Sequence, residues 1–252
     1  MIDAGISCRE TEKRMKRVGL LMSSVKAIFV SHEHADHISG IPVLCKKYQL
    51  PVYITQGTHK ESRMRIEKHL IMPFRAYEPV MIGRLSVNAF PKFHDAADPH
   101  SFIVSDNAIT VGVFTDIGRN CERVIHHFKQ CNAAFLEANF DMDMLTNGSY
   151  PYHLKKRISG GNGHLSNKEA LDLFNTHRPP YLSHLVLSHL SKNNNTPEIV
   201  EKLFTQYAGT TKIIIASRYE ETKVYEVTNT SIPVVKVTKP LVKQQAVQLS
   251  IF

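Results

Sequence analysis

Six consecutive residues combine imidazole and carboxylate side chains at a spacing typical of metal ligands. Residues 32–37 read H-x-H-x-D-H, with His32, His34, Asp36 and His37 as the candidate donors. Zn²⁺ and similar divalent ions prefer imidazole nitrogens and carboxylate oxygens. So tight a segment can direct some side chains at one ion and the rest at its neighbour. Two ions about 3.5–4 Å apart activate a shared water and stabilise a leaving oxygen, which predicts hydrolysis of a phosphodiester or an ester.

Three more candidate ligands come directly after strand-like runs, namely His94, Asp116 and His189. The H-x-H-x-D-H segment itself lies between a strand pattern at 27–30 and a helix pattern at 38–47. In α/β folds, functional side chains gather outside the carboxyl ends of the strands. We therefore expect all these residues to meet at one edge of a sheet.

The elements that must position these residues are strands interleaved with helices. Strand patterns cover 27–30, 52–55, 85–89, 102–105, 110–114, 134–138, 185–187, 213–216 and 223–227, and helix patterns cover 11–18, 38–47, 121–128, 168–176 and 197–207. Ser166 or Asn167 is a capping residue for one helix, and Thr196 followed by Pro197 begins another. The pattern predicts an α+β protein, a four-layer αββα sandwich with the metals at one edge between two sheets.

An ordered set of motifs resembles the metallo-β-lactamase superfamily, in particular the YycJ/WalJ-like branch of bacterial nuclease-type hydrolases. Besides H-x-H-x-D-H, the set comprises I-D-A-G with Asp3, H-D-A-A-D-P from His94, T-D-I-G with Asp116, L-E-A-N-F-D from Leu136, G-H-L-S-N with His164 and L-S-H-L-S with His189. These motifs extend over residues 2 to 228. The resemblance implies two divalent ions, Zn or Mn, and an exonuclease-like role in DNA repair.

The resemblance also implies which residues hold each ion. One ion would be bound by His32, His34 and His94, the other by Asp36, His37 and His189, and Asp116 would bridge them. Asp36, Asp116 and His164 are the residues expected to take part in catalysis. A metal-bridging hydroxide would attack phosphorus, and His164 would orient the phosphate or protonate the leaving oxygen.

Two of these assignments have alternatives. Asp116 could instead be a helix N-cap, because a helix-like run follows it. His164 competes with His189 for the last ligand position. We favour His189, because it ends a buried-strand pattern, whereas His164 follows a glycine-rich loop. The remaining histidines of note are expected to be incidental: His59, His69, His126 and His127.

Two features depart from the family pattern. Family members generally begin with another strand hairpin and an S-G-S-S-G-N loop, whereas Met1 already lies in the strand that leads to I-D-A-G. We therefore expect a fold that lacks its first N-terminal strands, and a misassigned start is our hypothesis. Phe140 stands where the family usually has a histidine, so we assign it no role.

Composition is typical of one large globular domain. The 252 residues are 42% hydrophobic, which suits a single hydrolase domain over 1–228. No apolar run reaches the roughly 18 residues of a membrane span, and no signal-type stretch opens the chain. The four cysteines lack C-x-x-C spacing and are expected to be free thiols. These features predict a cytoplasmic protein.

The net charge of +8 favours a polyanionic partner, because lysines and arginines that neutralise phosphates release condensed counterions. The leading prediction is a metal-dependent nuclease, with DNA as the favoured substrate. The segment between Asp116 and His189 is too short for the extra domain of RNA-processing β-CASP relatives. A small-molecule thioesterase or lactonase, with the same ligands, is the alternative, and a non-catalytic DNA-repair scaffold is a third possibility.

The last 24 residues, 229–252, lack clear periodicity and are expected to form a mobile tail. The tail ends in Gln248, Leu249, Ser250, Ile251 and Phe252. This Q-L-S-I-F sequence resembles the Q-L-x-L-F peptide by which bacterial repair and replication proteins bind the DNA sliding clamp. Leu249, Ile251 and Phe252 would enter an apolar groove while Gln248 forms the orienting hydrogen bonds. A last edge strand packed on the sheet is the alternative.

Overall fold

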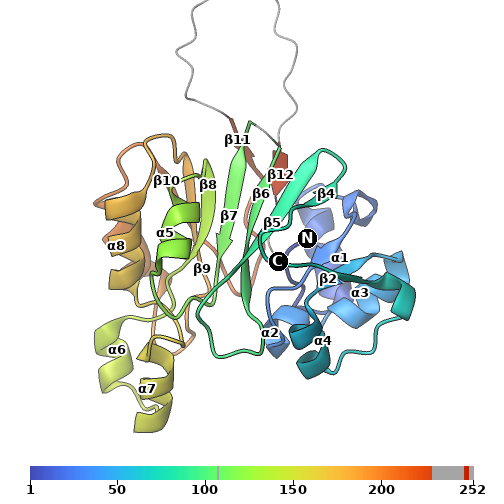
Figure 1. The fold of residues 1–252 in the computed structure, drawn as a ribbon. Helices are drawn as coiled ribbons and strands as arrows, with labels where there is room; N and C mark the ends of the chain where they lie inside the picture. The colour runs from blue at the N-terminus through green and yellow to red at the C-terminus, as the bar shows by residue number, and fades with distance from the viewer. Residues whose placement is uncertain (107, 229–246, 250–252) are drawn as a thin grey trace, which may run out of the picture.

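The computed structural model describes residues 1–106, 108–228 and 247–249, and its largest element is a mixed seven-stranded sheet (Figure 1). In spatial order its strands are β10 (Lys212–Ile215), β9 (His184–Ser188), β8 (Ala133–Glu137), β7 (Thr110–Phe114), β6 (His100–Ser105), β5 (Leu85–Pro91) and β4 (Val80–Ile82). Strands β7 to β10 are parallel, whereas β4 to β7 are antiparallel. The carboxyl ends of β7, β8 and β9 therefore meet at one edge.

A smaller parallel sheet faces this large sheet. It contains β1 (Ile28–Phe29), β2 (Val52–Ile54) and β3 (Ile71–Pro73), and Ile2 forms a parallel bridge with Phe29. Apolar side chains fill the space between the two sheets, with the rings of Phe29 and Phe102 packed edge to face at 5.8 Å. This packing fixes β1, and hence the H-x-H-x-D-H segment after it, against the large sheet.

Helices form the outer layers (Figure 1). On the large sheet pack α5 (Glu122–Phe128), α8 (Asn167–His177) and α9 (Pro197–Thr205), and on the small sheet pack α1 (Cys8–Arg17) and α3 (Ile41–Tyr48). The shorter helices are α2 (Ala35–Ile38), α4 (Gln56–Ser62), α6 (Met142–Asn147), α7 (Tyr152–Ser159), η1 (Met22–Ser24) and η2 (Lys68–Leu70). The predicted αββα order is confirmed.

Local signals explain where most helices begin. Ser166 and Glu169 form a capping box at α8, and the Thr196 side chain caps α9 ahead of Pro197. The single helix predicted over 38–47 is wrong, because the chain turns at Gly40 between α2 and α3. A Cβ on Gly40 would lie 2.0 Å from the Ile6 carbonyl oxygen, so this close approach requires glycine.

Part of the predicted tail forms a strand. β12 (Val247–Leu249) pairs antiparallel with β11 (Tyr225–Val227), with Leu249 opposite Tyr225. Ile251 and Phe252, the last two residues of the predicted clamp peptide, lie outside the described residues. All four cysteines are free, as expected. No helix in the described part of the chain has the length and apolarity to cross a membrane.

Candidate metal centre

The residues singled out in the sequence gather at the edge where β7, β8 and β9 end. His32 and His34 follow β1, Asp36 and His37 belong to α2, and His94 follows β5. Asp116 and His189 come two residues after β7 and one residue after β9, and His164 lies in the loop before α8. The potential ligand atoms form overlapping groups in which they lie within 4.8 Å of one another.

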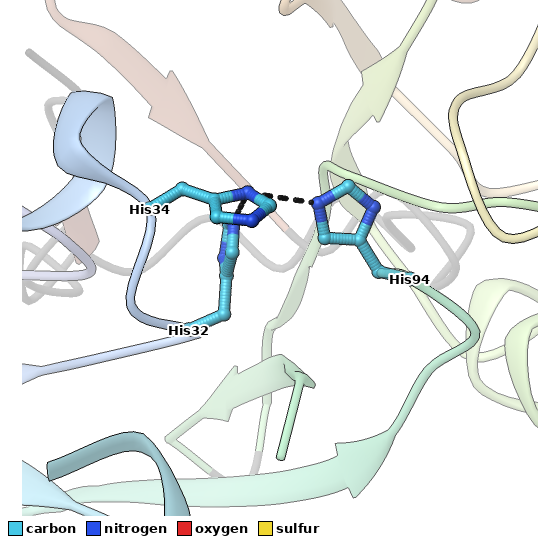
Figure 2. A group of neighbouring side chains, drawn as sticks. All are labelled: His32, His34 and His94. Atoms are coloured by element: carbon cyan, nitrogen blue, oxygen red, sulfur yellow. Dashed lines mark hydrogen bonds between the residues drawn. The ribbon is translucent and has the colours of Figure 1, made fainter. Parts of the chain in front are cut away.

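One group consists of three histidines (Figure 2). Nδ1 of His34 lies 3.0 Å from Nε2 of His32 and 3.2 Å from Nε2 of His94. The His32 and His94 side chains are buried, and His34 is half-buried. The three rings approach from two segments that are remote in sequence, as Figure 2 shows. Three ring nitrogens around one point form the donor set of a divalent metal site.

Outer hydrogen bonds fix the orientation of the His32 and His94 rings. The His94 Nδ1–H donates to the Gly163 carbonyl oxygen at 2.9 Å. The Ser31 hydroxyl donates to Asp3 at 2.7 Å and so accepts from the His32 Nδ1–H at 2.8 Å. With Nδ1 protonated, Nε2 of His32 and Nε2 of His94 keep their lone pairs, which is the state that a metal ligand needs.

A second group surrounds Asp116. The His37 Nδ1–H donates to Asp3 at 2.8 Å, and Nε2 of His37 lies 3.1 Å from Oδ2 of Asp116. Nε2 of His189 lies 3.4 Å from Oδ1 of Asp116 and 3.5 Å from Oδ2 of Asp36. Oδ1 of Asp116 is also 3.9 Å from Nε2 of His32 and 3.7 Å from Nε2 of His94. Asp116 therefore lies between the two groups.

Two unpaired buried atoms at the centre fit a bound cation. Nε2 of His37 and Oδ2 of Asp116 are both buried, and neither has a hydrogen-bond partner among the described residues. Buried polar atoms are normally paired, because leaving one unpaired costs about 1–3 kcal/mol. An ion held between a lone pair and a carboxylate oxygen would satisfy both. The residues present therefore fit divalent metal ions.

The buried carboxylates make the centre favourable for positive charge. Burial lowers the pKa of His37, but Asp116 and Asp3 outweigh it and raise the pKa to about 10. Burial raises the pKa of Asp116, but the charges of His189 and His37 outweigh it and hold the pKa well below its usual range. A divalent cation would replace the proton that these carboxylates otherwise stabilise on His37.

The structure excludes the helix-cap alternative for Asp116. Helix α5 begins at Glu122, and its N-cap residue is Cys121. Asp116 instead adopts a left-handed backbone conformation, with φ 53°, in the turn that leaves β7. Non-glycine residues in this conformation cluster at functional sites.

Glu137 belongs to the L-E-A-N-F-D motif, and its role becomes visible only in the structure. Its side chain is fully buried at the end of β8. Oε1 accepts from Nδ1 of both His164 and His189 at 2.8 Å, and Oε2 accepts from the backbone nitrogen of Ile117 at 2.7 Å. Burial raises the pKa of Glu137, but His164 and His189 outweigh it and lower the pKa to about 2. A glutamate inside an apolar strand was the available signal, because glutamate is rarely buried unless paired.

Both histidines that competed for the last ligand position lie at this edge. His189 directs Nε2 at Asp116 and Asp36, whereas Nδ1 of His164 is 3.9 Å from Asp116. This geometry favours His189 as the ligand, and its backbone is anchored by Asn139, whose Nδ2 donates to the His189 carbonyl oxygen at 2.7 Å. Phe140 is a fully buried core residue. The four histidines expected to be incidental belong to no potential ligand group among the described residues.

Comparison with known proteins gives one matching family model, the beta-lactamase superfamily domain, over residues 1–190. Exodeoxyribonuclease YycJ of Bacillus anthracis is 33% identical over 211 residues, which are 82% of this chain and 79% of the relative. Exodeoxyribonuclease WalJ of Streptococcus pneumoniae is 28% identical over 207 residues, which are 79% of this chain and 76% of the relative.

Solved structures share the fold at low sequence identity. The metallo-beta-lactamase fold protein YhfI of Bacillus subtilis matches with a TM-score of 0.66 and 18% identity, over 86% of this chain and 83% of that one. The Zn²⁺-bound PqqB of Methylobacterium extorquens matches with a TM-score of 0.67 and 14% identity, over 85% and 80% of the two chains. At such low sequence identity, both comparisons show a shared fold only.

Proposed function

The chain belongs to the metallo-β-lactamase superfamily, as its motifs predicted, and we propose that it is a metal-dependent nuclease that degrades DNA from an end. The single observation that carries this proposal is the position of Asp116 between two groups of ligand side chains. The names of the YycJ and WalJ relatives supply the substrate class.

His32, His34 and His94 would hold one divalent ion, and Asp36, His37 and His189 the other, with Asp116 shared. When bound, such ions lower the pKa of water and offset the negative charge that develops on a phosphodiester. Zn²⁺ and Mn²⁺ both accept this set of ligands. That a hydroxide shared by the two ions attacks the phosphorus atom remains a prediction.

His164 would supply the proton for the leaving oxygen. Glu137 accepts the His164 Nδ1–H and so fixes the orientation of the ring, which leaves Nε2 as the nitrogen that would exchange a proton with the substrate. The His164 side chain is 19% exposed, so a substrate can reach it. Glu137 would act through both rings by keeping them at a fixed orientation.

A role in DNA repair, with the sliding clamp as partner, is the second part of the proposal. It rests on the Q-L-S-I-F terminus. Gln248 and Leu249 lie in β12 opposite Glu226 and Tyr225. Binding of this peptide in a clamp groove would raise the effective concentration of the enzyme at DNA without sequence recognition.

Metal analysis followed by digestion assays tests the proposal. Protein purified without oxygen and loaded with Zn²⁺ or Mn²⁺ should cleave bis(p-nitrophenyl) phosphate and shorten end-labelled DNA. Single- and double-stranded DNA and RNA are compared side by side, with thioester and lactone substrates as controls. If only the thioester or lactone substrates are turned over, the protein is a small-molecule hydrolase and not a nuclease. If metal-loaded protein is inactive on every substrate, the non-catalytic scaffold is favoured.

A further inference from the structure

Two arginines beside the metal centre share one aromatic ring. The guanidinium carbon of Arg119 lies 3.6 Å from the centre of the Phe93 ring, and that of Arg123 lies 5.1 Å from it. Within the part of the chain that the structure describes, neither arginine forms an ion pair with a carboxylate. Nε of Arg123 is buried without a hydrogen-bond acceptor. Two like charges and an unpaired donor together favour an anion at this place.

The arginine pair lies at the same edge of the sheet as the metal centre. Phe93 directly precedes His94, and its carbonyl oxygen accepts from the Gly118 nitrogen at 2.6 Å. This bond joins the loop after β5 to the loop that carries Asp116 and Arg119. Arg123 belongs to the first turn of α5, which follows β7 (Figure 1). The pair is therefore connected through short backbone segments to two of the proposed metal ligands.

A third arginine near His94 differs in its charge balance. Arg157 of α7 forms an ion pair with Asp95, the residue after His94. Its charge is thus offset within the protein. Among the residues that the structure places, the loop 93–95 therefore has one arginine paired with a carboxylate on the Asp95 side and two arginines without such a partner on the Phe93 side. An anionic ligand would bind at Phe93 rather than at Asp95.

We propose that Arg119 and Arg123, held on Phe93, bind a backbone phosphate of the nucleic acid next to the phosphodiester that is cleaved. The inference rests on the proposed function and deepens it by assigning a contact outside the metal centre. A planar guanidinium matches the geometry of phosphate oxygens and stacks on an aromatic face at the same time. Phosphate contacts carry no sequence information, which suits an enzyme that must accept every successive nucleotide.

The test is equilibrium binding of a fluorescein-labelled single-stranded oligonucleotide to metal-free protein in EDTA over a series of salt concentrations. The double variant Arg119→Ala/Arg123→Ala should bind about tenfold or more weakly, and the slope of log K against log salt should fall by roughly 1–2. Lys129→Ala is the matched control, because this exposed lysine lies at the opposite end of α5. Its binding and salt slope should equal those of the wild type.

Phe93→Leu removes the platform and should weaken binding in the same direction, while adding little to the double variant. In steady-state assays the double variant should lose more kcat/KM on the oligonucleotide than on bis(p-nitrophenyl) phosphate, which has no second phosphate. Wild-type affinity in the double variant, or a loss no larger than in Lys129→Ala, would overturn the assignment. If the double variant does not fold, the single variant of exposed Arg119 decides the matter. Arginine-dependent binding by a protein that cleaves no nucleic acid would leave this site standing and reject the proposed function.

Discussion

Asp116 and His189 face each other from the ends of β7 and β9, with Nε2 of His189 3.4 Å from Oδ1 of Asp116. Both residues adopt a left-handed backbone conformation, with φ 53° and 57°. For residues other than glycine such conformations cost about 1–3 kcal/mol and persist only where surrounding contacts enforce them. Asp3, which orients His37, shares the feature with φ 53°. Among the described residues, three of the six non-glycine residues with positive φ therefore lie in turns that direct side chains at the centre; the other three are Gln49, Arg63 and Tyr77.

Asp116→Asn should lower both the metal content and the turnover of the protein. The asparagine amide keeps the shape of the side chain but removes the negative charge that Asp116 would offer to both metal ions. The loss of turnover should exceed the roughly 100-fold that removal of an outer hydrogen-bond partner typically causes. Metal per chain by mass spectrometry and hydrolysis of bis(p-nitrophenyl) phosphate are the measurements. Asp172→Asn, on the exposed face of α8, is the control; two metals and normal turnover in Asp116→Asn would show that Asp116 is no bridge.

Glu137→Gln should reduce turnover by about 10–100-fold. Both Glu137 oxygens face N–H donors, so an amide NH₂ would oppose a donor in either orientation. The rings of His164 and His189 would lose their common acceptor or Ile117 would lose its partner. Titration with Zn²⁺ and a pH–rate profile are the measurements, with Glu198→Gln on the exposed face of α9 as control. An unchanged profile and affinity would assign Glu137 to packing alone.

The candidate ligands of the centre could be recognised in the sequence, whereas the hydrogen-bond partners behind them, Glu137 and Asp3, could not be assigned a role. His32 to His37 are recognisable because four donors coincide with a strand-to-helix junction. Asp116 and His189 are recognisable because each follows an apolar strand. Glu137 and Asp3 also lie at the end of strand-like segments, but their roles depend on which histidine rings they contact in the folded chain. Such pairings arise from tertiary packing, so a local pattern can indicate a buried carboxylate but not the ring that it contacts.

The fold shows the same division between local and non-local information. Long strands and amphipathic helices were predicted within a few residues because apolar periodicity sets them. The elements 56–62, 71–73, 80–82, 142–147 and 152–159 were not predicted, since they are short and bury few side chains. The break at Gly40 depends on the Ile6 carbonyl oxygen, a contact that no pattern within the helix reveals.

His164→Ala should leave the metal content unchanged while lowering turnover by about 10²–10⁴-fold, the usual contribution of a general acid. The physical reason is that His164 lies outside both proposed ligand sets but shares Glu137 with His189. A substrate with a better leaving group should recover part of the loss, because it needs less protonation. Loss of one metal per chain in His164→Ala would exchange the roles of His164 and His189.

Glu12 links α1 to α3 and should make folding stability depend on acid pH. It accepts from Nζ of Lys47 at 2.7 Å, Sγ of Cys8 at 3.1 Å and Oη of Tyr48 at 2.8 Å. These bonds, that of Lys47 foremost, lower the pKa of Glu12 from 4.5 to about 2. Because the folded pKa is depressed, the stabilisation is present above pH 4.5 and is lost as the pH falls toward 2.

Glu12→Gln should therefore lower the Tm at about pH 6, and its Tm deficit should shrink at about pH 3. Differential scanning calorimetry of both proteins at the two pH values measures this. Glu61→Gln, an exposed change on α4, controls for the loss of one charge. An equal deficit at both pH values would mean that Glu12 stabilises the fold through packing instead of its charge.

The C-terminal peptide should bind the DNA sliding clamp independently of catalysis. Deletion of residues 248–252 should abolish co-elution with the clamp yet spare cleavage of a short oligonucleotide, because none of the proposed metal ligands belongs to this segment. The deletion also removes Gln248 and Leu249 from β12, which pairs with β11. The sharper variant is Ile251→Ala/Phe252→Ala, which keeps those strand residues while removing two of the apolar anchors expected in the groove. Ser250→Ala, at the position that the motif leaves open, is the matched control and should still bind. Absence of binding by the intact chain, or unchanged binding after the deletion, would reject a clamp-binding role.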